Sequence, residues 1–324
     1  MAVMKNINFT VIMPIYNKKP HIQRAVSSVL NQSFSKFELI LIDDASTDGS
    51  LEVVKQFNDD RIRLFKRDEP GPGGYAARNL GIENARADWI AFLDADDEWC
   101  PDYLDNMVNL SKKYPNASVL ASAWFIAWDE MSVLNPYAKN KCGDRCFDTS
   151  EYLKVHIKGD DLIHTNVVII TKAMFQQAGG FPECSESCKR AGDGQTWLRV
   201  VLNGAVTAWS AAPGAIYYQN AVNMVTKAKK YEIDENCLIT YIESCLGEDR
   251  YPEYSSLLRS YRNNRVASAL FQKLKDGEVS VDHLRMAFRC FSWDIRIAAV
   301  VFGFFLPRVG IKLFNLKTTI KGPA

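Results

Sequence analysis

Long apolar runs are missing from the sequence, and so is an N-terminal secretory signal. A membrane-spanning helix needs roughly 18 to 20 apolar residues. The longest apolar run, Ile297–Leu306, has ten residues and is closed by Pro307. Residues 1–8 do not form the apolar core of a signal peptide, and the chain contains no internal repeat or low-complexity segment. We therefore expect a cytoplasmic protein whose eight cysteines are mostly reduced thiols.

A large net charge of one sign is also missing. The 324 residues carry a formal net charge of +1, so no nucleic-acid partner is predicted. Residues 227–324 nevertheless hold 16 Lys and Arg against 11 Asp and Glu, and five basic and no acidic residues follow Asp294. We expect this basic, apolar tail, residues 295–321, to make peripheral contact with a membrane. The alternative is a packed terminal helix pair with a basic outer face.

Strands and helices alternate four times within the first 97 residues, which predicts an α/β fold. Short apolar strands that alternate with helices favour a parallel sheet covered on both faces. In such sheets the ligand lies outside the carboxyl ends of the strands. The strands are expected at 9–13, 38–42, 61–65 and 88–93, and the helices at 21–30, after residue 50 and at 75–85.

From residue 101 the pattern changes, and beyond residue 227 it predicts helices alone. Residues 129–160 show no regular pattern, and we expect them to be irregular. The other elements are expected as strands at 119–126, 167–170 and 205–209, and as helices at 103–114, 172–178, 193–202, 236–246, 254–275 and 281–290.

Acidic residues cluster directly after the fourth predicted strand, in the stretch FLDADDEW. Asp94 and Asp96 are two positions apart, so in an extended segment their side chains face the same side. Two carboxylates on one side suit Mg²⁺ or Mn²⁺, which bind protein carboxylates together with phosphate oxygens. The alternative is a solvated turn with an N-cap for the helix after Pro101. For Asp97 both interpretations stay open, a part in the site or a cap of the next segment. Because 14–17 and 43–44 also follow strand ends, the three polar clusters should meet in one cleft.

Four motifs in order carry a resemblance to a known family. PIYN at 14–17, LIDDASTDGS at 41–50, GGYAARNLG at 73–81 and FLDADDEW at 92–99 resemble the family 2 glycosyltransferases. The resemblance is close over the first 100 residues and looser to about residue 226. It implies the GT-A fold, a Rossmann-like, mostly parallel sheet flanked by helices, and transfer of a sugar from a nucleotide-sugar donor with inversion.

The resemblance also implies a division of the chain. We expect a GT-A domain over 1–226, with a nucleotide-sugar-binding half at 1–99 and an acceptor half at 100–226, and then an α-helical module over 227–324. Within the first half, Asp96 is implied as the metal ligand, and Asp94 as a contact to the ribose or to the metal. The residues implied to contact the nucleotide sugar are Pro14, Tyr16, Asn17, Asp43, Asp44, Arg78, Asn79, Asp94 and Ala95.

Each of the main donor residues also has a purely structural interpretation. Tyr16 can be a half-buried packing residue, Asp44 can cap the following helix, and Arg78 can form a surface salt bridge. A fixed guanidinium at Arg78 equally suits a diphosphate or a carboxylate of the cleft.

The catalytic base is implied by the stretch GDGQTWLRV at 192–200. It is similar to the family's Glu-Asp-x-x-Leu-Trp-Leu-Arg pattern, and Trp197 sets a register that places Asp193 at the base. Gly192 stands where the family usually has glutamate. A base at this point would take the proton of the acceptor hydroxyl. The alternative role for Asp193 is a helix N-cap.

On the acceptor side we expect His164, Trp197 and Asn220. His164 precedes a predicted strand, and a structural histidine is the alternative. Asn220 stands where related sequences often carry a histidine that completes the metal shell. An amide oxygen is a poorer ligand for a transition metal than imidazole, so no third protein ligand is expected and Mg²⁺ can serve as well as Mn²⁺.

Two cysteine pairs, Cys142 with Cys146 and Cys184 with Cys188, leave a zinc site as one interpretation. Their CxxxC spacing is one residue wider than the common one, which favours free thiols.

We expect a UDP-sugar donor and a glycan or lipid-linked acceptor, as in bacterial surface-polysaccharide assembly, at the cytoplasmic face of the inner membrane. One alternative to this enzyme function is a non-catalytic member of the same family, which binds a glycan or acts as a scaffold for an assembly. The other is a sugar nucleotidyltransferase, which usually has a glycine-rich basic loop where this chain has PIYNKKP.

Overall fold

The structure is a computed structural model that describes residues 8–141, 143–182, 190–222, 233, 236–275, 278 and 280–289. The strands are β1 (Phe9–Ile15), β2 (Phe37–Asp44), β3 (Ile62–Arg67), β4 (Trp89–Phe92), β5 (Glu98–Trp99), β6 (Val119–Trp128), β7 (Met131–Leu134), β8 (Arg145–Phe147), β9 (Val168–Thr171) and β10 (Thr207–Tyr218). The helices are α1 (Ile22–Leu30), α2 (Ser50–Val54), α3 (Tyr75–Glu83), α4 (Tyr103–Lys113), α5 (Thr149–Ile157), α6 (Lys172–Gln177), α7 (Gly192–Leu202), α8 (Cys237–Gly247), α9 (Ser255–Lys275) and α10 (Val281–Arg289).

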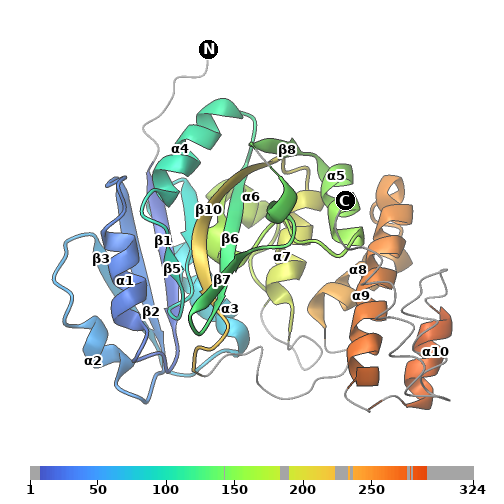
Figure 1. Ribbon diagram of the computed structural model, residues 1–324, viewed down its shortest axis with the longest axis horizontal. Coiled ribbons are helices and arrows are strands. Elements are labelled where there is room, and N and C mark those ends of the chain that lie inside the picture. The colour runs from blue at the N-terminus through green and yellow to red at the C-terminus, as the bar shows by residue number, and fades with distance from the viewer. Residues whose placement is uncertain are drawn as a thin grey trace.

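The strands of the described residues form one mixed sheet. Its order is β3-β2-β1-β4-β9-β6-β10-β5, with β7 paired to β6 and β8 to β10. Strands β1 to β4 pair in parallel, as do β6 and β10, whereas β9 runs antiparallel between β4 and β6. Figure 1 shows α1 and α2 beside the strands at one side of the sheet, and the helices α8 to α10 beyond its other side. The predicted sheet flanked by helices, followed by a helical C-terminal part, is confirmed.

Each face of the sheet is covered by its own hydrophobic cluster. Side chains alternate along a strand, so Ile12 and Ile42 belong to the cluster that also contains residues of α3, α5 and α7. Val11 and Leu41 belong to the other cluster, with residues of α1 and α4. The strands are therefore buried on both faces, which explains their nearly continuous apolar sequences.

Parallel pairing brings the ends of three strands to one edge of the sheet. Ile15 at the end of β1 lies opposite Asp43 of β2, and Ile12 lies opposite Phe92 at the end of β4. Helix α3 lies close against these strands, because a Cβ at Gly81 would come 2.7 Å from the Ile12 Cγ2 atom. The polar residues after β1, β2 and β4 consequently meet, as the sequence predicted.

The prediction that residues 129–160 are irregular is wrong. They contain β7, β8 and α5. Helix α5 begins with a capping box, in which the Asp148 side chain accepts from the Glu151 N–H and Glu151 accepts from the Asp148 N–H. This signal stands in the sequence as D-x-x-E. Strand β10 also continues to Tyr218 instead of ending at 209, with irregular pairing on either side of Pro213.

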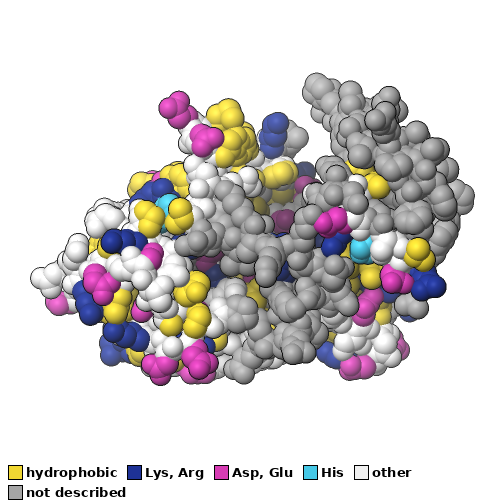
Figure 2. Space-filling view, turned by 90° about the horizontal axis from the view of Figure 1, so that it is seen from below, with side chains coloured by type: hydrophobic (Ala, Val, Ile, Leu, Met, Phe, Trp, Pro, Cys, Tyr) yellow, Lys and Arg dark blue, Asp and Glu magenta, His cyan; other side chains and the backbone are white. Residues whose placement is uncertain are grey.

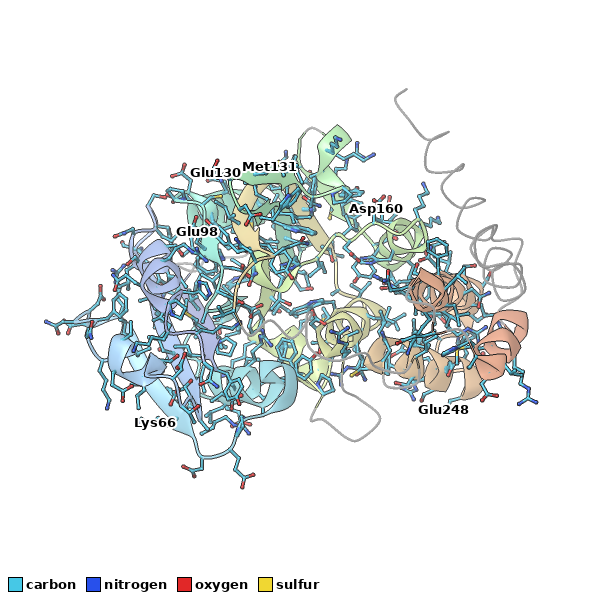
Figure 3. All side chains as sticks on the ribbon, turned by 60° about the horizontal axis from the view of Figure 1, so that its bottom comes forward. Lys66, Glu98, Glu130, Met131, Asp160 and Glu248 are labelled. Atoms are coloured by element: carbon cyan, nitrogen blue, oxygen red, sulfur yellow. The ribbon has the colours of Figure 1, made fainter. Side chains whose placement is uncertain are left out.

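The C-terminal helices pack directly on the sheet domain. Leu258 and Tyr261 of α9 belong to the same cluster as α7, and the Asn264 side chain donates to the Ile157 carbonyl at 2.6 Å. The edge strand β3 and the C-terminal helices lie on opposite sides of the molecule, as the positions of Lys66 in β3 and Glu248 after α8 show (Figure 3). The predicted domain boundary at 226 falls outside the described residues and stays a prediction.

No helix within the described ranges is long and apolar enough to cross a membrane. The tail at 295–321 lies outside those ranges.

Candidate functional site

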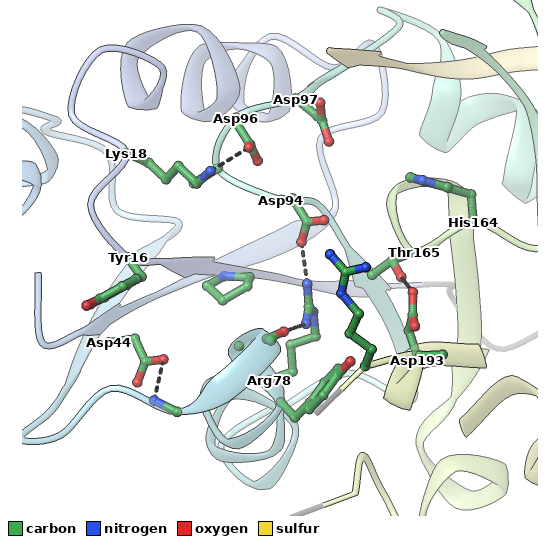
Figure 4. Close-up of a pocket in the computed structure, with 18 of the residues that line it drawn as sticks. Tyr16, Lys18, Asp44, Arg78, Asp94, Asp96, Asp97, His164, Thr165 and Asp193 are labelled. Atoms are coloured by element: carbon green, nitrogen blue, oxygen red, sulfur yellow. Dashed lines mark hydrogen bonds and ion pairs between the residues drawn. The ribbon is translucent and has the colours of Figure 1, made fainter. Parts of the chain in front are cut away.

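A pocket of about 360 Å³ lies at the edge where β1, β2 and β4 end (Figure 4). Residues that follow β1, β2 and β4, the segment before β9 and the start of α7 all contribute to its lining. The predicted site residues that line it are Pro14, Tyr16, Asp44, Arg78, Asp94, Ala95, Asp96, His164 and Asp193.

Asp44 and Tyr16 form one side of the pocket (Figure 4). Asp44 is buried, pairs with Arg67 and accepts a hydrogen bond from the Gly71 N–H at 3.1 Å. It therefore fastens the loop before α3 and does not cap the next helix. Tyr16 is 45% exposed, so part of its side chain is accessible to a ligand.

Two glycines allow the loop before α3 to approach the pocket. Gly73 and Gly74 have φ angles of 64° and 67°, in the left-handed region that side chains disfavour. Arg78 holds the loop, because its Nη1 donates to the Gly73 carbonyl at 2.7 Å. Its Nη2 pairs with Asp94. Arg78 is thus a buried brace between the glycine loop and the acidic stretch, and its guanidinium still lines the pocket.

The acidic stretch is divided among different partners. Asp94 pairs with Arg78, and an Asp96 carboxylate oxygen lies 2.6 Å from the Lys18 ammonium. The side chains of Lys18 and Asp96 are only 13% and 12% exposed. The positive charges of Lys18 and Arg78 offset the repulsion between the neighbouring carboxylates of Asp94 and Asp96.

Asp97 serves the fold. It is buried and accepts hydrogen bonds from the Tyr218 N–H at 2.7 Å and from the Asn166 side chain. Burial, and then the nearby charges of Asp96 and Asp94, raise the pKa of Asp97 well above its usual value. Asp97 therefore joins the acidic stretch to β10 and to the segment before β9, and it does not cap a helix.

The donor set at Asp94 and Asp96 fits a hard divalent cation. Both are carboxylates at the pocket surface, and Asp96 already holds a cation, the Lys18 ammonium, in close contact. Among the described residues no three His, Cys, Asp or Glu side chains converge in the way that would hold a metal by themselves. A metal here would accordingly take its remaining ligands from water and phosphate oxygens, as Mg²⁺ commonly does.

Asp193 lies across the pocket from Asp44 and Tyr16 (Figure 4). It is in the first turn of α7, where Asp193 Oδ1 accepts from the Gly194 N–H at 2.9 Å. The Thr165 hydroxyl lies 3.4 Å from Oδ2 and donates to it. The positive end of the helix dipole favours an ionised carboxylate at this place.

His164 stands between two aromatic rings. Its ring stacks on Trp124 at 5.1 Å and lies 4.9 Å from the Tyr217 ring. Its Nδ1 accepts from the Asn166 N–H, at 3.4 Å. Burial lowers the pKa of His164, although the charges of Asp94 and Asp193 oppose the shift. The lowered pKa favours a neutral imidazole near pH 7.

Five predicted site residues do not line the pocket. Asn17 and Asp43 accept hydrogen bonds from backbone N–H groups of the loop after β2. The Asn79 side chain donates a hydrogen bond to the Phe181 carbonyl and accepts one from the Phe181 N–H. Trp197 is buried in the core. The Asn220 amide donates to the Asp129 carboxylate, between β6 and β7. The five residues therefore contact other parts of the protein instead of the pocket.

Several lining residues were not singled out from the sequence. They are Lys18, Gly71, Gly73, Gly74, Tyr75, Thr165, Arg190, Ala191, Tyr217 and Asn236. Lys18 had a signal, because it directly follows PIYN, and Tyr75 stands inside the GGYAARNLG motif. Thr165 and Tyr217 had none, because only the tertiary fold brings them to Asp193 and His164.

The described cysteines do not form a zinc site. Cys146 is exposed and free, and Cys100 and Cys245 are free as well, whereas Cys237 is disulfide-bonded. Cys142, Cys184 and Cys188 lie outside the described residues, so the zinc interpretation stays untested.

Figure 2 shows acidic and basic side chains interspersed on one face of the molecule. Within the described surface of that face no broad basic patch is present.

Comparison with known sequences gives one family. The model of glycosyl transferase family 2 matches residues 10–174. An uncharacterized glycosyltransferase of Haemophilus influenzae is 44% identical over 102 residues, which cover 31% of this chain and 40% of the relative. WfgD of Escherichia coli, a UDP-Glc:α-D-GlcNAc-diphosphoundecaprenol β-1,3-glucosyltransferase, is 34% identical over 147 residues, 42% of this chain and 57% of WfgD. The matches thus span about half the length of these relatives.

Comparison with solved structures shows the same fold. The crystal structure of S. aureus TarS residues 1–349 with UDP-GlcNAc superimposes with a TM-score of 0.68 at 17% identity, and the match covers 94% of this chain and 88% of that one. TarS 1–349 with UDP gives a TM-score of 0.60.

Proposed function

The chain belongs to glycosyltransferase family 2, and from that premise we propose that it transfers a sugar from a UDP-sugar to a hydroxyl of a glycan or lipid-linked oligosaccharide, with inversion. One observation carries the proposal: residues from three strand ends and the first turn of α7 line a single pocket. WfgD and the TarS complex, whose names include UDP-Glc and UDP-GlcNAc, support the choice of nucleotide.

The donor side of the pocket is proposed at Pro14, Tyr16 and Asp44. Tyr16 offers an exposed ring on which a base can stack, and Asp44 offers carboxylate oxygens to the uracil or ribose. The loop glycines bring backbone close to the place where a diphosphate would lie. Arg78, fixed by Gly73 and Asp94, supplies a positive charge there.

Asp96, with Asp94 beside it, is proposed to hold Mg²⁺ or Mn²⁺. The bound metal would offset the charge that develops on the departing diphosphate. Asp94 and Asp96 would hold that ion, and in its absence Lys18 and Arg78 compensate the charge of the two carboxylates.

Asp193 is proposed as the general base. Its carboxylate would take the proton of the acceptor hydroxyl as the oxygen attacks the anomeric carbon, and the bond to diphosphate breaks on the opposite side of the sugar. The Gly194 N–H and the Thr165 hydroxyl hold the carboxylate in position. His164 and Tyr217 would line the acceptor side.

A lipid-linked acceptor is proposed because WfgD acts on a diphosphoundecaprenol compound. Membrane contact through residues 295–321 and a place at the cytoplasmic face of the inner membrane belong to the same proposal. Liposome flotation of the full chain, beside a variant with the five basic residues after position 294 changed to glutamine, tests it. Equal binding by both would refute the tail contact.

A thermal-shift screen of nucleotide sugars with Mg²⁺ or Mn²⁺ tests the function. A donor at 100 times its dissociation constant should stabilise the fold by about 2.7 kcal/mol. UDP release from that donor without acceptor then separates an enzyme from a scaffold. Binding of a glycan alone would favour the scaffold, and production of UDP-sugar from UTP and a sugar phosphate would favour a nucleotidyltransferase. No response to any nucleotide sugar would refute the proposal.

A further inference from the structure

Tyr75 lies between the glycine loop of the donor side and the first turn of α7. It is the first residue of α3, its side chain is 6% exposed, and its ring stacks on Phe181 at 5.9 Å with an interplanar angle of 12°. A Cβ built on Gly73 would come 2.6 Å from the Tyr75 ring, and one built on Gly192 would come 2.7 Å from it. The ring therefore occupies the space between these two glycines.

The Tyr75 hydroxyl also holds the backbone at the start of α7. The Gly192 N–H donates to the Tyr75 Oη atom at 2.9 Å. The first N–H groups of a helix have no partner within the helix, so this contact caps α7 from a distant element. Asp193 is the next residue, and its carboxylate position depends on the direction in which α7 begins.

The same contacts explain why position 192 is glycine. Any side chain there would meet the Tyr75 ring at 2.7 Å and Pro182 Cγ at 2.8 Å, both closer than real Cβ contacts. A glutamate at this position, as in the family pattern, would force the Tyr75 ring and Pro182 to shift. Tyr75 and Gly192 are consequently a matched pair, in which a side chain from α3 fills the place that residue 192 leaves open.

We infer that Tyr75 is a positioning residue that aligns Asp193 with the donor bound at the glycine loop. The inference rests on the proposed function, because it assumes that Asp193 is the base. Tyr75 does not take part in proton transfer. It fixes the backbone one residue before the base and touches the loop that would hold the diphosphate.

Tyr75→Phe tests the hydroxyl while it keeps the ring. We expect kcat to fall about tenfold or more, because small misplacements of a reacting group are costly. The KM for the donor, and the affinity for UDP measured by calorimetry, should stay within about twofold, since the donor contacts remain. The acid limb of the pH–kcat profile should move as well, because the environment of the Asp193 carboxylate changes.

Tyr103→Phe is the matched control. Tyr103 is fully buried, does not line the pocket, and its hydroxyl has no hydrogen-bond partner among the described residues. The same chemical change there should leave kcat and the pH profile unaltered. If Tyr75→Phe behaves like Tyr103→Phe, the inference is overturned, and if Asp193→Asn keeps full activity, the proposed function fails instead.

A double-mutant cycle keeps the inference testable if Tyr75→Phe folds poorly. In the wild-type background, which has Tyr75, Gly192→Ala should lower kcat strongly. In a Tyr75→Ala background, where the ring is gone, the fall in kcat caused by Gly192→Ala should be at least about threefold smaller. The Pro182 contact remains in both backgrounds. Equal effects of Gly192→Ala in the two backgrounds would show that the pair is not coupled and would overturn the inference.

Discussion

The Lys18 ammonium lies 2.6 Å from a carboxylate oxygen of Asp96 and 2.8 Å from the Val222 carbonyl, to which it also donates. Asp96 is the proposed metal ligand, so a protein cation and a metal ion would use the same carboxylate. A divalent ion that binds Asp96 must displace the ammonium or share the oxygens with it. The diphosphate of a donor would offer the displaced ammonium a new partner.

Lys18→Met should therefore strengthen metal binding when no nucleotide is present. Removing the competing ammonium leaves Asp96 ready for the ion, and we expect the dissociation constant for Mn²⁺ to fall about tenfold, which corresponds to about 1.4 kcal/mol. Electron paramagnetic resonance titration of free Mn²⁺ measures it. Lys19→Met, at the next and exposed residue, is the control. Weaker Mn²⁺ binding by Lys18→Met would contradict the competition.

Asp193→Asn should keep the fold and donor binding but lose most of the transfer. The amide keeps the size of the side chain and can still accept the Gly194 N–H, yet it cannot take a proton from an acceptor. We expect kcat to fall by a factor of about 10² to 10⁴. Single-turnover transfer from the donor identified by the screen measures this loss. Asp102→Asn, an exposed carboxylate at the start of α4 with no capping hydrogen bond, serves as control.

Much of the donor side could be predicted because it follows from local pattern. The apolar strands end where Pro14, Asp44 and Asp94 begin the polar clusters, and parallel pairing then brings them together. The same motifs could not separate ligand contacts from braces. Asn79 stands beside Arg78 in one motif, yet it bonds to backbone after α6 and not to the pocket.

The parts that escaped prediction depend on contacts between distant residues. Thr165 meets Asp193 only through the fold, and Tyr75 meets Gly192 across 117 positions. The departure at Gly192, which the sequence presented as a weakness of the resemblance, is explained by Tyr75. Helix α5 is a different case, because its capping signal, D-x-x-E, lies within the local sequence and depends on no distant contact.

Gly81→Ala should destabilise the fold through the contact between α3 and the sheet. The new methyl carbon would come 2.7 Å from Ile12 and 3.1 Å from Ile42, and both side chains are fully buried. Overpacking of this kind typically costs about 1–3 kcal/mol. Urea unfolding followed by circular dichroism measures the change. At Gly247 a Cβ would meet nothing within 4 Å, so Gly247→Ala should not lower stability, and an equal loss in both variants would contradict the packing argument.

Asp59 should contribute a stability that disappears in acid. Its carboxylate accepts from the Arg61 N–H at 2.9 Å and from the Arg61 guanidinium at 2.9 and 2.7 Å, while Arg61 also donates to the Leu30 carbonyl at the end of α1. These hydrogen bonds, above all those from the Arg61 side chain, lower the pKa of Asp59 from 3.8 to about 2.

Because the folded-state pKa is depressed, the contribution is complete well above pH 3.8 and is lost as the pH falls through about 2. Asp59→Asn should therefore lower the free energy of unfolding at pH 7 by about 1 kcal/mol, a value discounted for the solvent-accessible position of the pair. The difference between wild type and variant should fall to about half at pH 3. Urea unfolding at pH 7, 5 and 3 measures it, with the neighbouring exposed Asp60→Asn as control. A difference that stays constant from pH 7 to pH 3 would show that the Asp59–Arg61 pair does not act through its charge.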